Sequence, residues 1–325
     1  MNLRYPKYYI GPMSKNIVDA IIEFYEETNN SIGFIPSRRQ IEHNGGYVNK
    51  WTTAEFSQYV NNRLPIMRDH AGPNQGHIED TGYESLTHDC NNFNMIHIDP
   101  WIKYPKYKDG LQHTIEMIEF IYKHNSKIKY EIGTEESIRR FEPEELDMLL
   151  NDLHVRLEEE IFAQIKYVVI QSGTSLKENL NTGNYNSTRL KQMVKVVKRY
   201  NKLTKEHNGD YLPINLIKEK FTLGLDAINI APEFGQIETK VYLDKIKNEK
   251  PELLGLLYGI CYNSDKWKKW VSKDFNPLVQ KEELINICGH YVLSNSNFQR
   301  IKDEFPNIDI NIKNKIKTKL NELYK

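Results

Sequence analysis

Residues 65–74 read Pro-Ile-Met-Arg-Asp-His-Ala-Gly-Pro-Asn, a short apolar run that ends in an acid, an imidazole and a turn. Short runs of this kind, bounded by glycine and proline, are typical of buried β-strands. The residues just before the run, 53–62, carry a helical pattern. Ionisable groups that follow a strand in α/β proteins are well placed to meet a ligand. The stretch therefore predicts an α/β fold with a site at Asp69 and His70.

The same alternation recurs along the chain and predicts eight strands. Eight strands separated by helices favour a (β/α)8 TIM barrel, and a doubly wound open sheet is the alternative. We expect Ser14 and Ser187 to act as helix N-caps. The expected strands are Tyr8–Met13, Ile32–Pro36, Pro65–Asp69, Met95–Asp99, Lys129–Ile132, Tyr167–Gln171, Leu203–His207 and Ala227–Ala231. The expected helices are Asn16–Glu27, Thr53–Asn62, Leu111–His124, Pro143–Gln164 and Thr188–Tyr200.

The chain from Tyr262 onward carries no strand pattern and is rich in Lys and Asn. We therefore expect residues 1–261 to form the barrel and residues 262–325 to form appended C-terminal helices that pack on it. A single barrel of this size is common, because such barrels often exceed 250 residues.

Composition and charge exclude several classes of partner. The chain has 44 Lys+Arg and 44 Asp+Glu, so it has no field that would gather nucleic acid or an anionic membrane. The longest apolar stretch, Leu253–Tyr262, is about half of what spans a bilayer. Three scattered cysteines and the lack of a signal-peptide pattern point to a reducing compartment. We expect a cytoplasmic protein that binds neither nucleic acid nor membrane.

Polar residues recur at the C-terminal ends of the predicted strands. One acid there can simply cap the next helix, and a lone histidine is more often structural, as we expect for His43, His77, His113, His124 and His154. Recurrence at several strand ends favours a site instead, because a purely structural barrel needs no converging ionisable groups. The groups in question are Asp69-His70, His97-Ile98-Asp99, Glu131, Gln171-Ser172-Gly173-Thr174, Glu206-His207-Asn208-Gly209-Asp210 and Glu233.

Three segments suggest particular ligands. Two histidines with nearby carboxylates are reasonable ligands for zinc, manganese or cobalt. Ser172, Gly173 and Thr174 supply small residues and backbone N–H groups of the kind that hold phosphate, although an ordinary turn has the same composition. Arg38 and Arg39 could grip a phosphate or carboxylate, or lie solvated on the surface.

On these residues the chain resembles the accessory (non-catalytic) subunits of tagatose-1,6-bisphosphate aldolase, distant relatives of the zinc-dependent class II aldolases. The most specific match is residues 69–74, which differ by one letter from the Asp-His-Leu-Gly-Pro-Asn motif of that family. Weaker matches follow in the family's order at residues 40–47, 53–56, 96–99, 131–135, 169–173 and 206–211.

The chain also departs from the family pattern. A glutamate expected after the second strand is missing, and Pro36-Ser37-Arg38-Arg39 stands there. Glu233 is an added carboxylate after the eighth strand. The histidine that catalytic relatives carry near the sixth strand is absent, and only Gln171 or Thr174 is available. The lost glutamate together with Arg38 and Arg39 suggests a different or more anionic substrate, and the missing histidine argues against an ordinary zinc aldolase.

The resemblance assigns roles to individual residues. It implies that Asp69 is the acid/base, that His70 and His207 bind a divalent metal, expected to be zinc, and that the third ligand is Glu131, Asp99 or Gln171, of which we prefer Glu131. Asp99 and Glu131 complete the expected catalytic set with Asp69. The expected substrate-binding residues are Arg38, Arg39, Asn74, Gln171, Ser172, Gly173, Thr174, Asp210 and Glu233.

Three functions fit these assignments. The first is a metal-dependent aldolase-type carbon–carbon lyase that acts on a phosphorylated or nucleotide-linked sugar through an enediolate. The second is a non-catalytic subunit that stabilises a class II tagatose-bisphosphate aldolase. The third is a sugar isomerase or epimerase on the same barrel, since an enediolate serves both reactions. We prefer an enzyme, and a homo-oligomer is compatible with the sequence.

Overall fold

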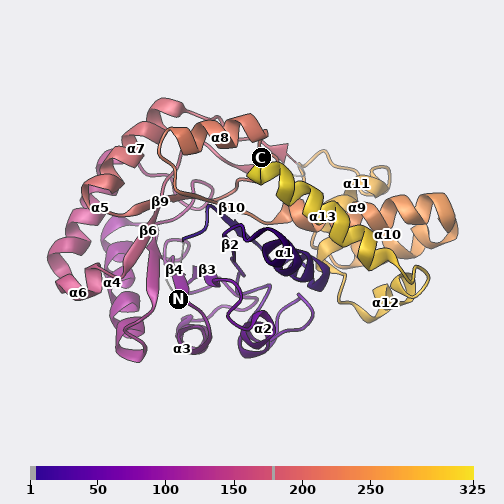
Figure 1. Ribbon diagram of the computed structural model, residues 1–325, viewed down its shortest axis with the longest axis horizontal. Coiled ribbons are helices and arrows are strands. Elements are labelled where there is room, and N and C mark those ends of the chain that lie inside the picture. Colours follow the sequence, from indigo (N-terminus) through magenta and orange to yellow (C-terminus); the bar gives the residue numbers. More distant parts are fainter. Residues whose placement is uncertain (1–4, 178–179) are drawn as a thin grey trace.

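Eight parallel strands form the centre of the computed structural model, which describes residues 5–177 and 180–325 (Figure 1). Their order is β2-β1-β10-β9-β6-β5-β4-β3, and parallel bridges from Phe34 to Ile66 and from Ser37 to Asp69 join the two ends of the sheet. The predicted (β/α)8 TIM barrel is confirmed. The strands are β1 (Tyr8–Ile10), β2 (Ile32–Phe34), β3 (Met67–Ala71), β4 (Met95–Ile98), β5 (Lys129–Ile132), β6 (Ile165–Val169), β9 (Leu203–Glu206) and β10 (Ala227–Ile230).

Helices surround this barrel and follow the strands along the chain (Figure 1). They are α1 (Lys15–Thr28), α2 (Thr53–Val60), α3 (Tyr83–Asn92), α4 (Tyr107–His124), α5 (Pro143–Arg156), α6 (Glu159–Phe162), α7 (Ser187–Arg199), α8 (Ile214–Thr222) and α9 (Pro232–Glu249). A short hairpin of β7 (Leu176–Lys177) and β8 (Leu180–Asn181) interrupts the connection from β6 to α7.

All eight predicted strands are present, and two details of the helices differ from the prediction. The helix expected over Pro143–Gln164 is wrong as a single element, because Leu157 adopts an extended conformation with ψ 147° and buries its side chain. The cap expected at Ser187 is also wrong. Asn186 caps α7 instead, since its side chain accepts a hydrogen bond from the backbone N–H of Arg189. Ser14 caps α1 as predicted.

The barrel interior has an apolar layer, and ionisable side chains lie between this layer and the mouth of the barrel. Tyr9, Met67, Met95 and Tyr167 pack together in a small buried cluster inside the barrel. Above them the buried Nζ atom of Lys205 lies 2.8 Å from Oε2 of Glu131. A larger apolar core between the strands and the outer helices holds the remaining layers together.

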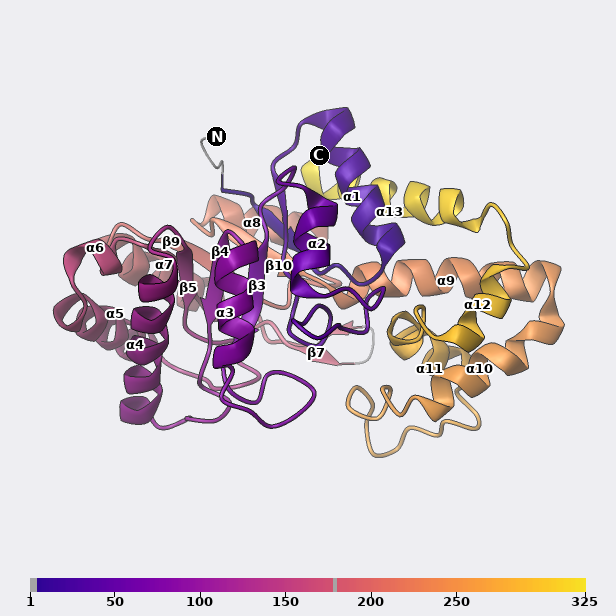
Figure 2. The same ribbon diagram turned by 90° about the horizontal axis from the view of Figure 1, so that it is seen from below.

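The chain beyond α9 is helical and has two parts. Residues 251–302, here called the C-terminal lobe, comprise η1 (Pro251–Leu253), α10 (Leu254–Asn263), α11 (Lys281–Cys288), η2 (Gly289–Tyr291) and α12 (Ser296–Lys302). Figure 2 shows α9 running from the barrel into this lobe, and α13 (Ile308–Tyr324) returning to pack along α1. The division of the chain at residue 262 stays a prediction. Among the described residues, no helix has the length and apolar character needed to cross a membrane.

Candidate active site

A bulge in β3 positions the first two residues of the site. Arg68 pairs with Ile96 of β4 and Ala71 with Ile98, so three residue steps on β3 face two on β4. The extra residue makes both Asp69 and His70 available at the mouth of the barrel, and His70 takes a positive φ of 43°. A bulge of this type re-aims side chains next to active sites. The backbone itself therefore prepares this pair for a ligand.

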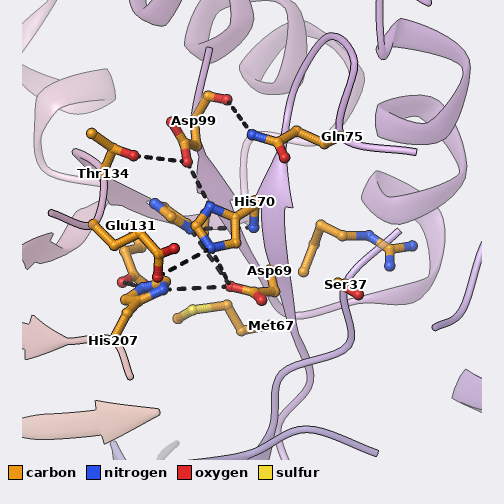
Figure 3. A network of polar contacts seen from close by, with 12 residues as sticks. Ser37, Met67, Asp69, His70, Gln75, Asp99, Glu131, Thr134 and His207 are labelled. Atoms are coloured by element: carbon orange, nitrogen blue, oxygen red, sulfur yellow. Dashed lines mark hydrogen bonds and ion pairs between the residues drawn. The ribbon is translucent and has the colours of Figure 1, made fainter. Parts of the chain in front are cut away.

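His97 on β4 and His207, which directly follows β9, complete a cluster around Asp69. The Oδ1 atom of Asp69 lies 3.6 Å from Nε2 of His70, 3.8 Å from Nδ1 of His97 and 3.7 Å from Nδ1 of His207. One ligand atom from each of the four residues lies within 4.8 Å of the others. Figure 3 shows Asp69 and His70 of β3 and His207, which follows β9, pointing toward one another.

The outward-facing nitrogen of each histidine is held by an acceptor that carries no proton. Nδ1 of His70 lies 2.6 Å from Asp99, Nε2 of His97 lies 3.0 Å from the carbonyl of Gly133, and Nε2 of His207 lies 2.8 Å from Glu131. Carboxylates and carbonyls only accept hydrogen bonds, so each of these nitrogens bears the hydrogen. The inward-facing Nδ1 of His97 is therefore an acceptor, and it takes a hydrogen bond of 3.2 Å from the backbone N–H of His70. The inward-facing nitrogen of His207 keeps its lone pair, and that of His70 does so once it loses its second proton.

These contacts also set the charges in the cluster. Burial would raise the pKa of Asp69, but the neighbouring histidines His70, His97 and His207 outweigh it, and the pKa falls well below its usual range. Burial lowers the pKa of His70, yet Asp69 and Asp99 overcome this and raise it to about 10. The pKa of His207 is lowered by burial despite Glu131. The cluster thus combines an ionised carboxylate with carboxylates that attract positive charge to His70.

The cluster fits a divalent cation. Oδ1 of Asp69 is buried and has no hydrogen-bond partner among the described residues, which is costly for a carboxylate oxygen. Its distances to the three nitrogens are too long for hydrogen bonds, so a cation held by those nitrogens would lie beside this oxygen and balance its charge. Three histidines with a free fourth position are a donor set of catalytic zinc sites.

Glu131 lies one layer behind this cluster. Its Oε1 accepts from His207, and its Oε2 pairs with the ammonium of Lys205 at 2.8 Å. Lys205 and His207 hold the pKa of Glu131 well below its usual range in spite of its burial. Both carboxylate oxygens of Glu131 therefore already have partners, and the contact with His207 orients its ring. The third ligand preferred from sequence is replaced in this arrangement by His97.

A cavity of about 290 Å³ opens above the cluster. Asp69, His70 and His207 lie at its base. Glu135 also lines it and accepts a hydrogen bond of 2.7 Å from Nδ2 of Asn208. The rim is formed by Arg39 from the loop after β2 and by Lys269, Trp270 and Tyr291 from the C-terminal lobe. The site therefore combines barrel loops with residues far along the chain.

The predicted binding residues divide into two groups. Arg39 and Asp210 line the cavity, and burial together with Glu233 raises the pKa of Asp210 to about 7. The remaining predicted residues do not line the cavity, because their polar groups contact other parts of the protein. Arg38 pairs with Glu42 and Asp80, Asn74 bonds Asp80, Gln171 bonds the backbone of Phe141, and Ser172 bonds Glu206. The hydroxyl of Thr174 donates to the carbonyl of His207, and Glu233 pairs with Lys319. Gly173 has a positive φ of 92° and packs against the backbone of Asn184.

Sequence reasoning did not assign roles to His97 and Glu135. A signal for His97 was available, because residues 95, 97 and 99 share one face of a strand and Met95 packs inside the barrel. No local signal marks Lys269, since its position depends on how the C-terminal lobe packs against the barrel.

No family model and no curated protein sequence matches this chain. Solved structures do match its fold. A probable tagatose 6 phosphate kinase from Sinorhizobium meliloti 1021 has a TM-score of 0.69 at 15% identity, with 96% of this chain and 86% of that chain covered. A fructuronate-tagaturonate epimerase from Cohnella laeviribosi has a TM-score of 0.61 at 10% identity, covering 99% and 82%. A fructose-bisphosphate aldolase from Campylobacter jejuni has a TM-score of 0.54 at 12% identity, covering 94% and 90%. These likenesses concern the fold.

Proposed function

We propose that this protein is a metal-dependent carbon–carbon lyase of the aldolase type that acts on a sugar through an enediolate. The observation that carries the proposal is the convergence of three oriented histidines on one buried, unpartnered carboxylate oxygen. The aldolase and epimerase among the similar folds support a sugar as the substrate class. The cavity of about 290 Å³ is near the lower limit for ligand pockets and favours a monosaccharide over a nucleotide-linked sugar.

His70, His97 and His207 would hold the cation, and zinc suits this donor set. When bound, the cation supplies Lewis acidity that favours the enediolate form of a carbonyl substrate. Asp99, Gly133 and Glu131 hold the three rings in place from behind. Outer partners of this kind fix ligand orientation and tautomer.

Asp69 is the residue placed to move a proton. Its lowered pKa keeps it ionised, and its side chain is partly open to the cavity. An ionised carboxylate beside the substrate takes a proton as the carbon–carbon bond breaks and returns it as the bond forms. The protein thus separates two tasks between adjacent residues, with binding assigned to His70 and proton transfer to Asp69.

Epimerisation is the second candidate, and Glu135 favours it. An epimerase that works by proton transfer has to remove a proton on one face and return it on the other. Glu135 lines the same cavity as Asp69, and its Oε2 lies 3.9 Å from Nε2 of His70. Two carboxylates, one on β3 and one in the loop after β5, would serve the two faces of one substrate. An accessory subunit needs neither of them.

One experiment tests the enediolate and separates these candidates. Zinc-loaded protein is incubated in D2O with ketohexoses, their acids and their phosphates, and NMR detects deuterium next to the carbonyl. A lyase also releases a shorter carbonyl product, and an epimerase yields the stereoisomer. The absence of exchange, cleavage and isomerisation across the panel would contradict both, and co-purification with a class II aldolase chain would then support the accessory role.

The variant Asp69→Asn should lose about 10²–10⁴-fold of this exchange rate, the usual contribution of a general base. It should still bind about one zinc per chain, because the three histidines remain. Glu135→Gln is the matched comparison, since it should abolish epimerisation and spare cleavage. Unchanged exchange in Asp69→Asn would remove Asp69 from the mechanism.

A further inference from the structure

The base and the rim of the cavity carry charges of opposite sign. Its base carries the carboxylate of Asp69 among the histidines, whereas its rim carries two cations, Arg39 and Lys269. Arg39 follows β2, and Lys269 lies between α10 and α11 in the C-terminal lobe. Two segments separated by more than two hundred residues therefore deliver positive charge to one end of the cavity.

Neither rim cation is neutralised by a carboxylate within residues 5–177 and 180–325. The Nε atom of Arg39 donates to the carbonyl of Gly76 at 3.0 Å. The ammonium of Lys269 lies 4.3 Å from the ring centre of Trp270 and 5.3 Å from that of Tyr291. Their direct neighbours in sequence behave differently. Arg38 pairs with Glu42 and Asp80, and Lys268 pairs with Asp265 at 2.8 Å.

The rim cations also raise the local potential. The pKa of Lys269 falls to about 8, first because of desolvation and then because of repulsion from Arg39 and Lys266. The pKa of His77 is lowered by burial and by the charges of Lys266 and Arg39. Holding like charges together without a counter-ion costs free energy. An anion at the rim would relieve this repulsion.

We propose that Arg39 and Lys269 bind an anionic group, a carboxylate or a phosphate, at the end of the substrate remote from the reacting carbonyl. This inference rests on the proposed function and deepens it, since it makes the substrate a sugar acid or sugar phosphate. It also makes the C-terminal lobe part of the active site. The guanidinium gives directed hydrogen bonds to such an oxyanion, and the ammonium adds a mobile charge.

The other candidate anion sites are already filled by the protein. The backbone N–H and hydroxyl of Ser172 both donate to Oε1 of Glu206, and Lys220 donates to that hydroxyl. Arg38 is enclosed by two carboxylates. Tyr47 and Tyr291, whose ring centres lie 5.0 Å apart, form an aromatic wall beside Arg39 and Lys269. The rim therefore offers an anion both charge and an apolar surface for the adjoining carbon chain.

Calorimetric titration with three matched ligands tests the proposal. Fructose, fructuronate and fructose 6-phosphate share a carbon skeleton and differ in charge at one end. The protein of residues 1–325 should bind a charged ligand about tenfold or more tightly than fructose, the effect expected of one charge-assisted contact. A preference for fructuronate identifies carboxylate as the anion, and a preference for the 6-phosphate identifies phosphate. Equal affinity for all three would overturn the proposal.

Variants locate the effect. Lys269→Met and Arg39→Gln should each remove most of the preference for the charged ligand, measured as the ratio of its affinity to that of fructose in the same variant. Lys268→Met is the matched control, because Lys268 is the adjacent lysine and already has a carboxylate partner. A preference that survives in both Lys269→Met and Arg39→Gln would contradict the assignment.

A second measurement needs no substitution and no metal. Limited acetylation near pH 7.5, read by mass spectrometry, should modify Lys269 faster than Lys268, and fructose 6-phosphate or fructuronate should protect Lys269 alone. Modification of Lys269 that no anion slows would overturn the anion site. Because metal-free protein is used, protection without zinc binding would leave the anion site standing while the proposed lyase fails. Zinc-dependent exchange without protection would show the reverse.

Discussion

Beneath the histidine cluster, Lys205 and Glu131 form an ion pair with no exposure of either side chain. Removing one member leaves a buried charge without its partner, at a cost of about 3–5 kcal/mol. We predict that Glu131→Gln lowers the free energy of unfolding by this amount in urea titrations of the metal-free protein. It should also weaken zinc binding by about 10–100-fold, because His207 loses its orienting acceptor.

A double variant separates the two effects of Glu131. Glu131→Gln combined with Lys205→Met removes the unpaired ammonium and should recover part of the lost stability. Zinc affinity should stay low, since His207 still lacks the carboxylate. Recovery of both properties would mean that Glu131 acts only through Lys205, and that the contact with His207 has no influence on the metal.

Single residues also show which parts of the site were predictable. Asp69, His70 and His207 were predicted because each lies at or just beyond a strand end, where a local pattern is informative. His97 was given no role, although strand alternation places it on the inner face with Met95. Arg38 and Arg39 could not be told apart from sequence, because the difference depends on Glu42 and on Asp80 from a distant loop.

At the level of elements, α1, α9 and α13 meet around one buried carboxyl group, Glu238. It accepts hydrogen bonds from Ser14 and Asn16 at the start of α1, and Asn16 also donates to Asp309 of α13. Burial and, to a lesser extent, Asp309 raise the pKa of Glu238 to about 7, although the hydrogen bonds from Ser14 and Asn16 and the charge of Lys302 lower it. The junction that docks the last helix onto the barrel therefore favours the protonated acid.

The folded state consequently binds a proton at Glu238 more tightly than the unfolded chain does. This contribution to stability is complete below about pH 4.5 and is lost as pH rises toward 7. We predict that Glu238→Gln, which mimics the protonated form, matches the wild type near pH 4.5. At pH 8 the variant should be more stable by up to about 3 kcal/mol. Urea titrations at both pH values measure this difference.

Glu249 on the same helix provides the control for Glu238. Its side chain is about half exposed and pairs with Lys245, so Glu249→Gln should change stability little at either pH. A difference between Glu238→Gln and the wild type that does not grow with pH would contradict the assignment of a raised pKa to this junction.

Elements were predicted well where the signal is local. The eight strands are short apolar runs whose periodicity is visible in sequence, and their number favours the barrel that the structure closes. The end of α5 could not be predicted, because Leu157 leaves the helix to fill a space in the core that only the folded protein defines. Similarly, Asn186 and Ser187 are both good caps, and the backbone conformation decides between them.

For the molecule as a whole, the C-terminal lobe changes what the barrel can bind. A barrel alone would present Arg39 and the histidine cluster. Lys269, Trp270 and Tyr291 line the same cavity because α9 carries the chain outward to the C-terminal lobe, which lies beside the barrel in Figure 2. Sequence predicted that helices are appended and could not predict this contact, which depends on the path of more than fifty residues.

The ligands proposed for the cation come from the neighbouring strands β3 and β4 and from the end of β9, which lies across the barrel from β3 in the strand order. Unfolding scatters them, so a cation that binds only the folded state stabilises the whole molecule by about 2.7 kcal/mol at one hundred times its Kd. For a protein of this size we predict that excess zinc raises Tm by several degrees and that chelation reverses the rise. His97→Gln should abolish the response. An equal response to magnesium, which prefers oxygen ligands, or a full response in His97→Gln would contradict a site built from three histidines.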